Sequence, residues 1–339
     1  MSKSEKKLFG ISIAVCALLS IAIYFFGMTL TGMEHLPDTG AAWYYWKLPQ
    51  ATAAGRISAW SLFILHLGTV WFLLYRLRKA QEADSADVRK HNVLLLAVNL
   101  LFVLLHFVQT ALWYDGLAQD VPVWSSQFSV IGMLVLILLM ENGRRGLFFG
   151  KKISFVTKSA APVFRYHGIY IAWALIYTFW FHPMENTWGH LIGFFYMFLL
   201  FVQLSMAYTK LHQTPLWTFT LEIIVMFHGT MVAILQNNGI WPMFFFGFGL
   251  IFAVTQLYGL NLSKKAIVSW TSIYVIGVVL VYSGLLFGVR SFGRIHEITW
   301  IPVIEYGLVF LLSAILNLLQ PLLSKKKASN MTLSEKIKD

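Results

Sequence analysis

The stretch LFGISIAVCALLSIAIYFFGM occupies residues 8–28 and contains no charged residue. At a rise of about 1.5 Å per residue, a helix of this length crosses a hydrocarbon core about 30 Å thick. Further apolar runs of similar length follow at residues 57–77, 93–114, 123–140, 163–181, 188–208, 216–235, 243–260, 268–289 and 301–320. The sequence therefore predicts an all-α, polytopic integral membrane helix bundle of about ten transmembrane helices.

The composition agrees with a chain whose main solvent is lipid. Of its 339 residues, 58% are hydrophobic and 12% are charged, whereas about a quarter of the residues of a soluble protein are charged. No linker rich in proline, glycine or serine divides the chain. We predict one transmembrane helical domain over residues 1–323 and a short, disordered cytoplasmic tail over residues 324–339.

The basic residues assign the two sides of the membrane. The chain carries 26 Lys and Arg residues, and of these only Lys47, Arg56, Arg290 and Arg294 fall in segments that alternate to the outside. Cytoplasmic loops are enriched in Lys and Arg, so both termini are expected in the cytoplasm. The net charge of +11 then reflects topology and contact with membrane lipids rather than with nucleic acid. We expect a multi-pass protein of a bacterial inner membrane.

Two connecting segments are longer than a tight turn requires. The outer segment 29–56 is rich in Trp and Tyr and could form a lid on the outer face. The inner segment 141–161 contains GRRGLFFGKK, in which basic and apolar residues alternate in short groups. Such a pattern is typical of an interfacial element on anionic lipid.

Three histidines lie inside predicted spans at one depth. Counted from the outer ends of their spans, His66, His106 and His228 each lie about 14–15 Å below the outer interface. Two more, His182 and His190, flank a short outer turn. Ionisable residues within a bilayer are costly and commonly functional, and neutral imidazole is the commonest metal ligand in proteins. We therefore predict that these five histidines bind haem or a transition metal (Cu, Fe or Zn) for redox chemistry.

Other charged residues complete the candidate site. The carboxylates of Glu222 and Glu305 fall within predicted spans and are candidate catalytic groups. The outer turn that contains Arg290 and Arg294 is a candidate for binding an anionic substrate. The same residues leave two alternatives open, a proton-coupled secondary transporter of a small molecule and a membrane transferase acting on lipid or lipid-linked substrates.

No sequence motif decides between these functions. The histidines do not form an HExxH or HxxHH arrangement, and the one cysteine, Cys16, can build neither a disulfide framework nor a cysteine metal site. Ten spans in a chain of this length also match drug/metabolite exporters and integral membrane acyltransferases in size. An acyltransferase of that kind has an Arg and a His about eleven residues apart near the chain start, which Arg56 and His66 do not reproduce. The chain is therefore assigned to no family.

Overall fold

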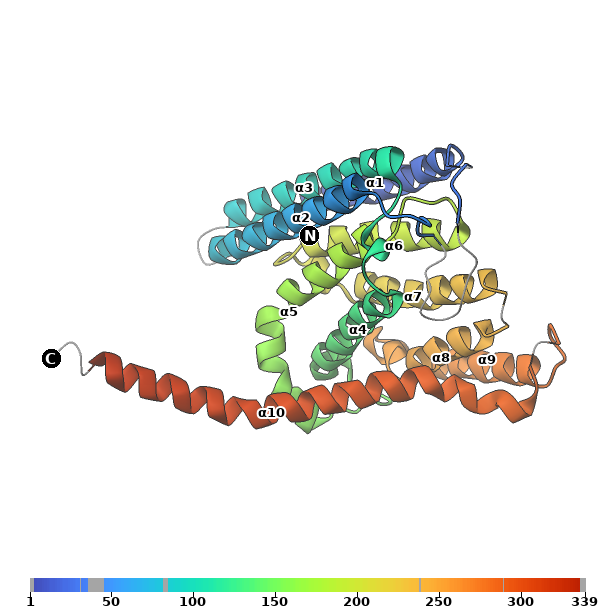
Figure 1. Cartoon of the computed structure of the whole chain (residues 1–339). Helices are drawn as coiled ribbons and strands as arrows, with labels where there is room; N and C mark the ends of the chain where they lie inside the picture. The colour runs from blue at the N-terminus through green and yellow to red at the C-terminus, as the bar shows by residue number, and fades with distance from the viewer. Residues whose placement is uncertain are drawn as a thin grey trace. The chain divides into compact units, whose positions relative to one another are not determined.

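The computed structural model describes residues 3–30, 32–35, 46–81, 85–237, 239–288 and 290–335 (Figure 1). The α-helices formed by these residues are α1 (Lys3–Gly27), α2 (Ala53–Gln81), α3 (Ser85–Trp113), α4 (Val123–Arg145), α5 (Ser154–Phe181), α6 (Trp188–Ser205), α7 (Pro215–Leu235), α8 (Trp241–Val254), α9 (Lys264–Tyr282) and α10 (Trp300–Glu335). Short 3-10 helices η1 (Leu117–Gln119), η2 (Leu211–Gln213), η3 (Gln256–Gly259) and η4 (Phe292–Thr299) lie between them. Within the described ranges there is no β-strand, and the predicted all-α class is confirmed.

The helices correspond in order to the predicted spans. Eight helical segments of the described chain are long and apolar enough to cross a membrane. The two exceptions are α5, whose first half contains Pro162 and basic side chains, and α8. With 14 residues, α8 is about 21 Å long, which is shorter than a hydrocarbon core of about 30 Å. The protein is a multi-pass membrane protein, and the assignment of its termini to the cytoplasm stays a prediction.

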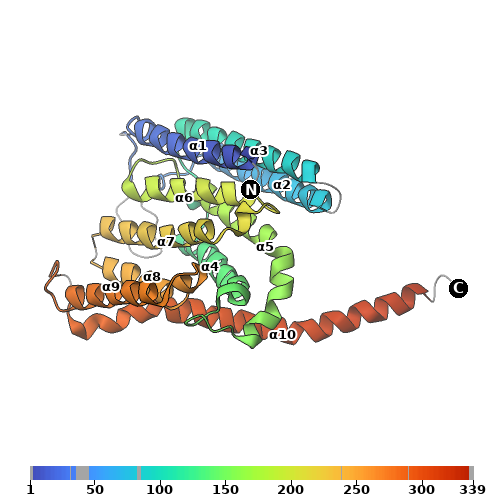
Figure 2. The same ribbon diagram turned by 180° about the vertical axis from the view of Figure 1, so that it is seen from behind.

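The chain divides into two compact units. Unit 1 comprises Met1–Met133 and Gly168–Phe245, and unit 2 comprises Leu134–His167 and Phe246–Asp339. In unit 1, α2 packs on α3, α6 packs on both α1 and α3, and α7 packs on α6. Figures 1 and 2, seen from opposite sides, show α1, α2 and α3 running side by side. In unit 2, η4 contacts α9 and α10.

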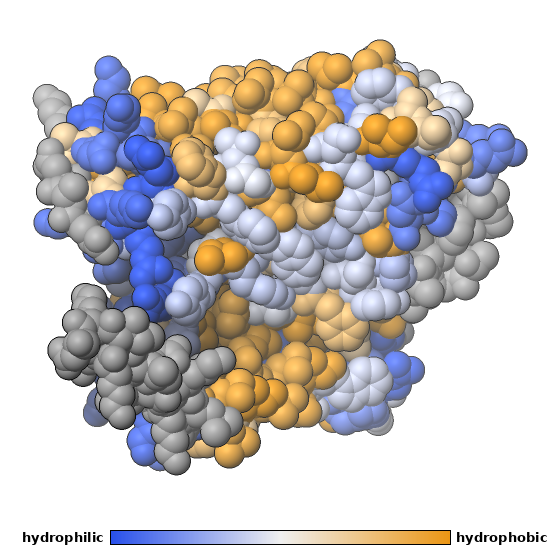
Figure 3. All heavy atoms as spheres, turned by 60° about the vertical axis from the view of Figure 1, so that its left-hand side comes forward, coloured by the Kyte–Doolittle hydropathy of each residue, from blue (hydrophilic) through white to orange (hydrophobic). Residues whose placement is uncertain are grey.

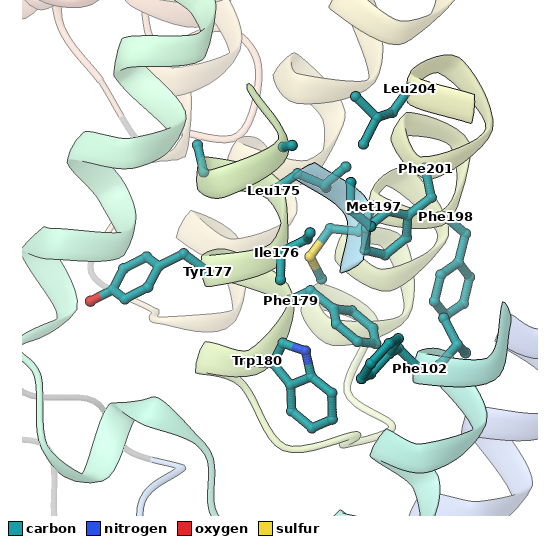
Figure 4. Close-up of a cluster of buried hydrophobic side chains, with 14 of the residues drawn as sticks. Phe102, Leu175, Ile176, Tyr177, Phe179, Trp180, Met197, Phe198, Phe201 and Leu204 are labelled. Carbon is teal, nitrogen blue, oxygen red and sulfur yellow. The ribbon is translucent and has the colours of Figure 1, made fainter. Parts of the chain in front are cut away.

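Aromatic side chains from the second half of α5 form the centre of unit 1. Phe179 and Trp180 are fully buried, and Phe102 of α3 and Phe201 of α6 are nearly so. Figure 4 shows these rings gathered with Met197 and Phe198 between the three helices. The centroids of the Phe179 and Phe201 rings lie 5.3 Å apart at 80°, an edge-to-face contact. This packing fixes α5 against α3 and α6.

Large apolar side chains also lie on the outside of the molecule. Leu18 of α1 is 64% exposed and Ile57 of α2 is 67% exposed. On the face shown in Figure 3, hydrophobic residues cover broad areas and hydrophilic ones gather towards the edges. In water such a surface would be unfavourable, whereas in a bilayer it contacts lipid chains.

Two predicted segments differ from, or fall outside, the described structure. α10 continues to Glu335, within the segment 324–339, and the last four residues lie outside the described ranges, so the disorder of this tail stays a prediction. The segment contains five Lys residues, and Lys favours helix. In the predicted outer lid, residues 31 and 36–45 lie outside the described residues.

Candidate functional site

A row of buried polar residues follows one face of α3. Asn92, Asn99 and His106 recur every seven residues, and at about 100° per residue seven residues return to within about 20° of the same direction. Their side chains are 2%, 3% and 0% exposed, respectively. Thr110, one turn further, is also fully buried. Together they form a polar seam along α3 that is about 27 Å long, close to the thickness of a hydrocarbon core.

His66 of α2 is bonded through both of its ring nitrogens. Its Nε2 lies 2.9 Å from Asn99 Oδ1, and Trp180 Nε1 donates to its Nδ1 over 3.2 Å. Because an indole nitrogen can only donate, Nδ1 is the acceptor, and Nε2 carries the proton that is donated to Asn99. Asn99 Nδ2 in turn donates to Ser205 Oγ over 3.0 Å. This chain fixes a neutral tautomer of His66 and joins α5, α2, α3 and α6.

His106 is buried among aromatic rings rather than among hydrogen-bonding groups. The Phe179 and Trp180 ring centroids lie 4.7 Å and 4.5 Å from that of His106. Neither ring nitrogen of His106 has a hydrogen-bond partner of good geometry among the described residues, although the main chain of His182 lies close. His66 and His182 are near enough to His106 for electrostatic interaction. A buried imidazole without a hydrogen-bond partner of good geometry can accept a proton or bind another cation.

The remaining predicted histidines, His182, His190 and His228, lie close to one another. The centroids of the His182 and His190 rings are 5.7 Å apart. His228 of α7 interacts electrostatically with both and hydrogen-bonds to the main chain of Gly189. A Cβ atom on Gly193 of α6 would lie 2.9 Å from His228 Nε2, so glycine allows this close approach. Burial, followed by the nearby His228, lowers the pKa of His182 to about 3.

A second polar cluster covers the outer end of the seam. Tyr114 OH donates to Glu185 Oε1 over 2.7 Å and lies 3.2 Å from His35 Nε2. Burial raises the pKa of the Glu185 carboxyl above its usual value. The ring of Trp46 contacts both His35 and His190, at centroid distances of 5.2 Å and 5.3 Å. These contacts close the outer end of the site with groups that can exchange protons.

Asp115 lies directly after α3, in the same cluster. Its Oδ2 accepts from Leu48 N over 3.2 Å and its Oδ1 accepts from Gly116 N over 2.8 Å. The side chain of Gln109 donates to the main-chain oxygen of Asp115. Burial is the main cause that raises the pKa of the Asp115 carboxyl to about 6, and these main-chain donors act against it.

The structure thus brings the five predicted histidines into one unit, but not into one coordination sphere. Among the described residues, no group of three or more His, Cys, Asp or Glu side chains is arranged to hold a metal ion. Hydrogen bonds use both ring nitrogens of His66, which leaves no lone pair for a metal. A haem or metal at these histidines stays a prediction.

The two predicted catalytic carboxylates belong to different units. Glu222 of α7 in unit 1 is 7% exposed, and Glu305 of α10 in unit 2 is 3% exposed. Both are therefore buried within their units, which is uncommon for a carboxylate and is consistent with a functional or a structural role. Their catalytic roles stay predictions.

The predicted substrate arginines are both bound to one buried carboxylate. Arg290 Nε donates to Glu297 Oε1 over 2.5 Å, and Arg294 Nη2 donates to Glu297 Oε2 over 3.2 Å. Tyr282 OH also donates to Glu297, which is 1% exposed. Glu297 therefore neutralises part of this positive charge, and its hydrogen bond from Tyr282 joins η4 to α9. Binding of a substrate by Arg290 and Arg294 stays a prediction.

Several residues of the seam and of the hydrogen-bonded chain from Trp180 to Ser205 are absent from the sequence-based site. Uncharged polar and aromatic residues are common in membrane helices, so residue type alone does not distinguish Asn92, Asn99, Ser205 and Trp180. The seven-residue spacing of Asn92, Asn99 and His106 is visible in the sequence and could have identified the first two. No family model matches the chain, and it matches none of the curated proteins or solved structures with which it was compared.

Proposed function

We propose that this protein is a proton-coupled secondary transporter of a small molecule, and that unit 1 contains its proton site. The observation that carries the proposal is the polar seam, a row of buried polar residues along α3 that contains His106 and that bonds through Asn99 to His66 of α2. Proton binding at the histidines would change charge in surroundings of low dielectric. The hydrogen-bonded chain Trp180–His66–Asn99–Ser205 joins α5, α2, α3 and α6, and its member Trp180 contacts the His106 ring, so a change of charge there would act on the packing of these four helices.

His106 is the residue that we assign as the principal proton acceptor. Its ring nitrogens lack good hydrogen-bond partners among the described residues, and His182 lies next to it. Protons would enter through the outer cluster of Glu185, Tyr114 and His190. Because adjacent buried charges repel strongly, a second proton on a neighbouring imidazole would be disfavoured, so protons would pass one at a time.

Proton flux into vesicles tests this proposal. Purified protein is reconstituted into liposomes that contain a pH-sensitive dye, and a potassium gradient with valinomycin supplies the driving force. We expect His106→Phe to reduce proton entry at least ten-fold. His296→Gln, at an exposed histidine of η4 outside the seam, serves as the control and should conduct like the wild-type protein. Wild-type flux in a correctly folded His106→Phe variant would refute the assignment of His106.

A metal or haem at His106, His182 and His190 is our second proposal. The open ring nitrogens of His106 and the adjacent rings of His182 and His190 favour it, since each neutral imidazole can supply one lone pair. Metal analysis and a visible absorption spectrum of protein purified without chelators test it. A stoichiometric metal or a haem band that is lost in His106→Phe would support this function, and their absence would leave the proton role alone. The transferase alternative and the bacterial inner-membrane location stay predictions.

A further inference from the structure

A cavity of 280 Å³ lies in unit 1 at the end of the seam opposite to the histidines. It is lined by Glu5 and Leu8 of α1, Gln81 of α2, Val88, Arg89 and Asn92 of α3, and Met206, Tyr208 and Thr209 after α6. Asn92 is the first residue of the seam, and Ser205, to which Asn99 is bonded, immediately precedes Met206. The cavity is therefore adjacent to the point where the hydrogen-bonded chain from the histidines ends.

The cavity wall carries one positive and one negative side chain. Arg89 is exposed, and no described carboxylate forms an ion pair with its guanidinium group. Glu5, on α1, supplies a carboxylate. Asn92 Nδ2 donates to Ala207 O over 3.3 Å, whereas its Oδ1 has no hydrogen-bond partner among the described residues. The lining thus offers a cation for an anionic group, and a carboxylate and an amide oxygen for a hydrogen-bond donor.

The helix dipoles at the cavity repeat this separation of charge, because one helix end favours an anion and another favours a cation. Val88 and Arg89 lie at the N-terminus of α3, where the helix dipole favours an anion. Gln81 is the last residue of α2, and the C-terminus of a helix favours a cation. A ligand with only one charge would be favoured at one part of this wall and disfavoured at the other.

We propose that the cavity binds a small zwitterion with an ammonium group and an anionic group, and that this is the cargo class of the transporter. Arg89 and the start of α3 would bind the phosphate or carboxylate, and Glu5 would bind the ammonium. A volume of 280 Å³ equals that of about nine water molecules at about 30 Å³ each, which suits a ligand of similar size. The role as cargo rests on the proposed function, whereas the binding site itself does not.

Calorimetry of the full-length protein in detergent tests this site with phosphoethanolamine as the probe. We expect phosphoethanolamine to bind at least ten-fold more tightly than phosphate or ethanolamine alone, and Arg89→Gln and Glu5→Gln each to weaken binding at least ten-fold. Lys90→Gln, at the neighbouring exposed residue of α3, is the matched control and should bind like the wild-type protein. Because the three probes are compared on the wild-type protein, this part of the test does not depend on the folding of any variant.

Two sources could supply this chemistry, a soluble zwitterion such as an amino acid and the headgroup of phosphatidylethanolamine. Alanine competing with phosphoethanolamine would indicate a soluble ligand, and phosphatidylethanolamine that remains on the wild-type protein but not on Arg89→Gln in native mass spectrometry would indicate a lipid. Equal binding of phosphate and phosphoethanolamine, or wild-type binding by both variants, would overturn the proposal. Because binding is measured without a proton gradient, its failure is distinct from a failure of proton transport.

Discussion

Replacement of Asp115 by Asn should change the stability of the protein in opposite directions at low and high pH. Burial raises the pKa of this carboxyl from 3.8 to about 6, so the folded protein binds the proton more tightly than the unfolded chain does. The stability that this group contributes is fully present below about pH 4 and is lost as the pH rises through about 6. At 1.36 kcal/mol per pKa unit, the loss for a shift of about two units is about 3 kcal/mol.

The amide that Asp115→Asn introduces carries no charge at any pH and avoids this loss. An amide cannot accept from both Leu48 N and Gly116 N as the carboxylate does, and the lost hydrogen bond costs about 1 kcal/mol. Asp115→Asn should therefore be more stable than the wild-type protein by about 2 kcal/mol at pH 8 and less stable by about 1 kcal/mol at pH 3. The sign of the difference changes between these pH values.

Thermal unfolding in detergent, followed by tryptophan fluorescence at pH 3, 6 and 8, measures this difference. Asp120→Asn is the control, because Asp120 forms an ion pair with Arg56 and accepts from Trp60 Nε1 over 2.8 Å. Its replacement should destabilise the protein at pH 8. A lower unfolding temperature for Asp115→Asn at pH 8, or a difference that does not vary with pH, would refute the reasoning.

Four further predictions concern the seam, the arginine pair, one glycine and the topology. Asn99→Leu leaves the Nε2–H of His66 without its partner and should lower the free energy of unfolding by about 1–3 kcal/mol, and an unchanged unfolding midpoint would contradict this. Glu297→Gln weakens the binding of the nearly buried Arg290 and should lower the free energy of unfolding by about 3–5 kcal/mol. Arg294→Gln, at an exposed side chain, should lower it by about 1 kcal/mol or less. Equal losses in denaturant titrations would argue against these contacts. Gly116→Ala places a Cβ atom 2.8 Å from the main-chain oxygen of Phe181 and should reduce the yield of folded protein, whereas Gly68→Ala meets no atom within 4 Å and should not. A reporter inserted at Asp120 should be active only outside the cell and one fused after residue 327 only in the cytoplasm, and a cytoplasmic signal at Asp120 would contradict the ten-span topology.

The fold class was predictable because it depends on run length and composition. An apolar run without charge that is as long as residues 8–28 is typical of a membrane-spanning helix and of no other common structure. Helix ends were less predictable, since hydropathy indicates which residues lie in the bilayer, whereas backbone hydrogen bonds decide where the helix begins and ends. α1 therefore begins at Lys3, before the apolar run, and α10 continues to Glu335, after it.

The histidine group was partly predictable, because counting along a helix gives depth but not direction. His66 and His106 share a depth and both contact Trp180, whereas His228 lies against Gly193 of α6. The rotation of each helix about its axis decides these neighbours, and it follows from packing over the whole bundle. The contribution of Trp180 was not predictable, since nothing in the sequence places the end of α5 between α2 and α3.

The hydrogen-bonded chain and the unbonded imidazole of His106 have different roles. His66, Asn99 and Ser205 form a chain in which each bond fixes the next, so replacing a member should mainly reduce stability. At His106 the contacts are aromatic rings, and its removal leaves no strong hydrogen bond broken. A proton that binds there meets no competing donor, whereas at His66 it would have to displace Trp180 from Nδ1. Under the proposed function, His106→Phe should therefore affect proton flux more than stability, and Asn99→Leu should affect stability first.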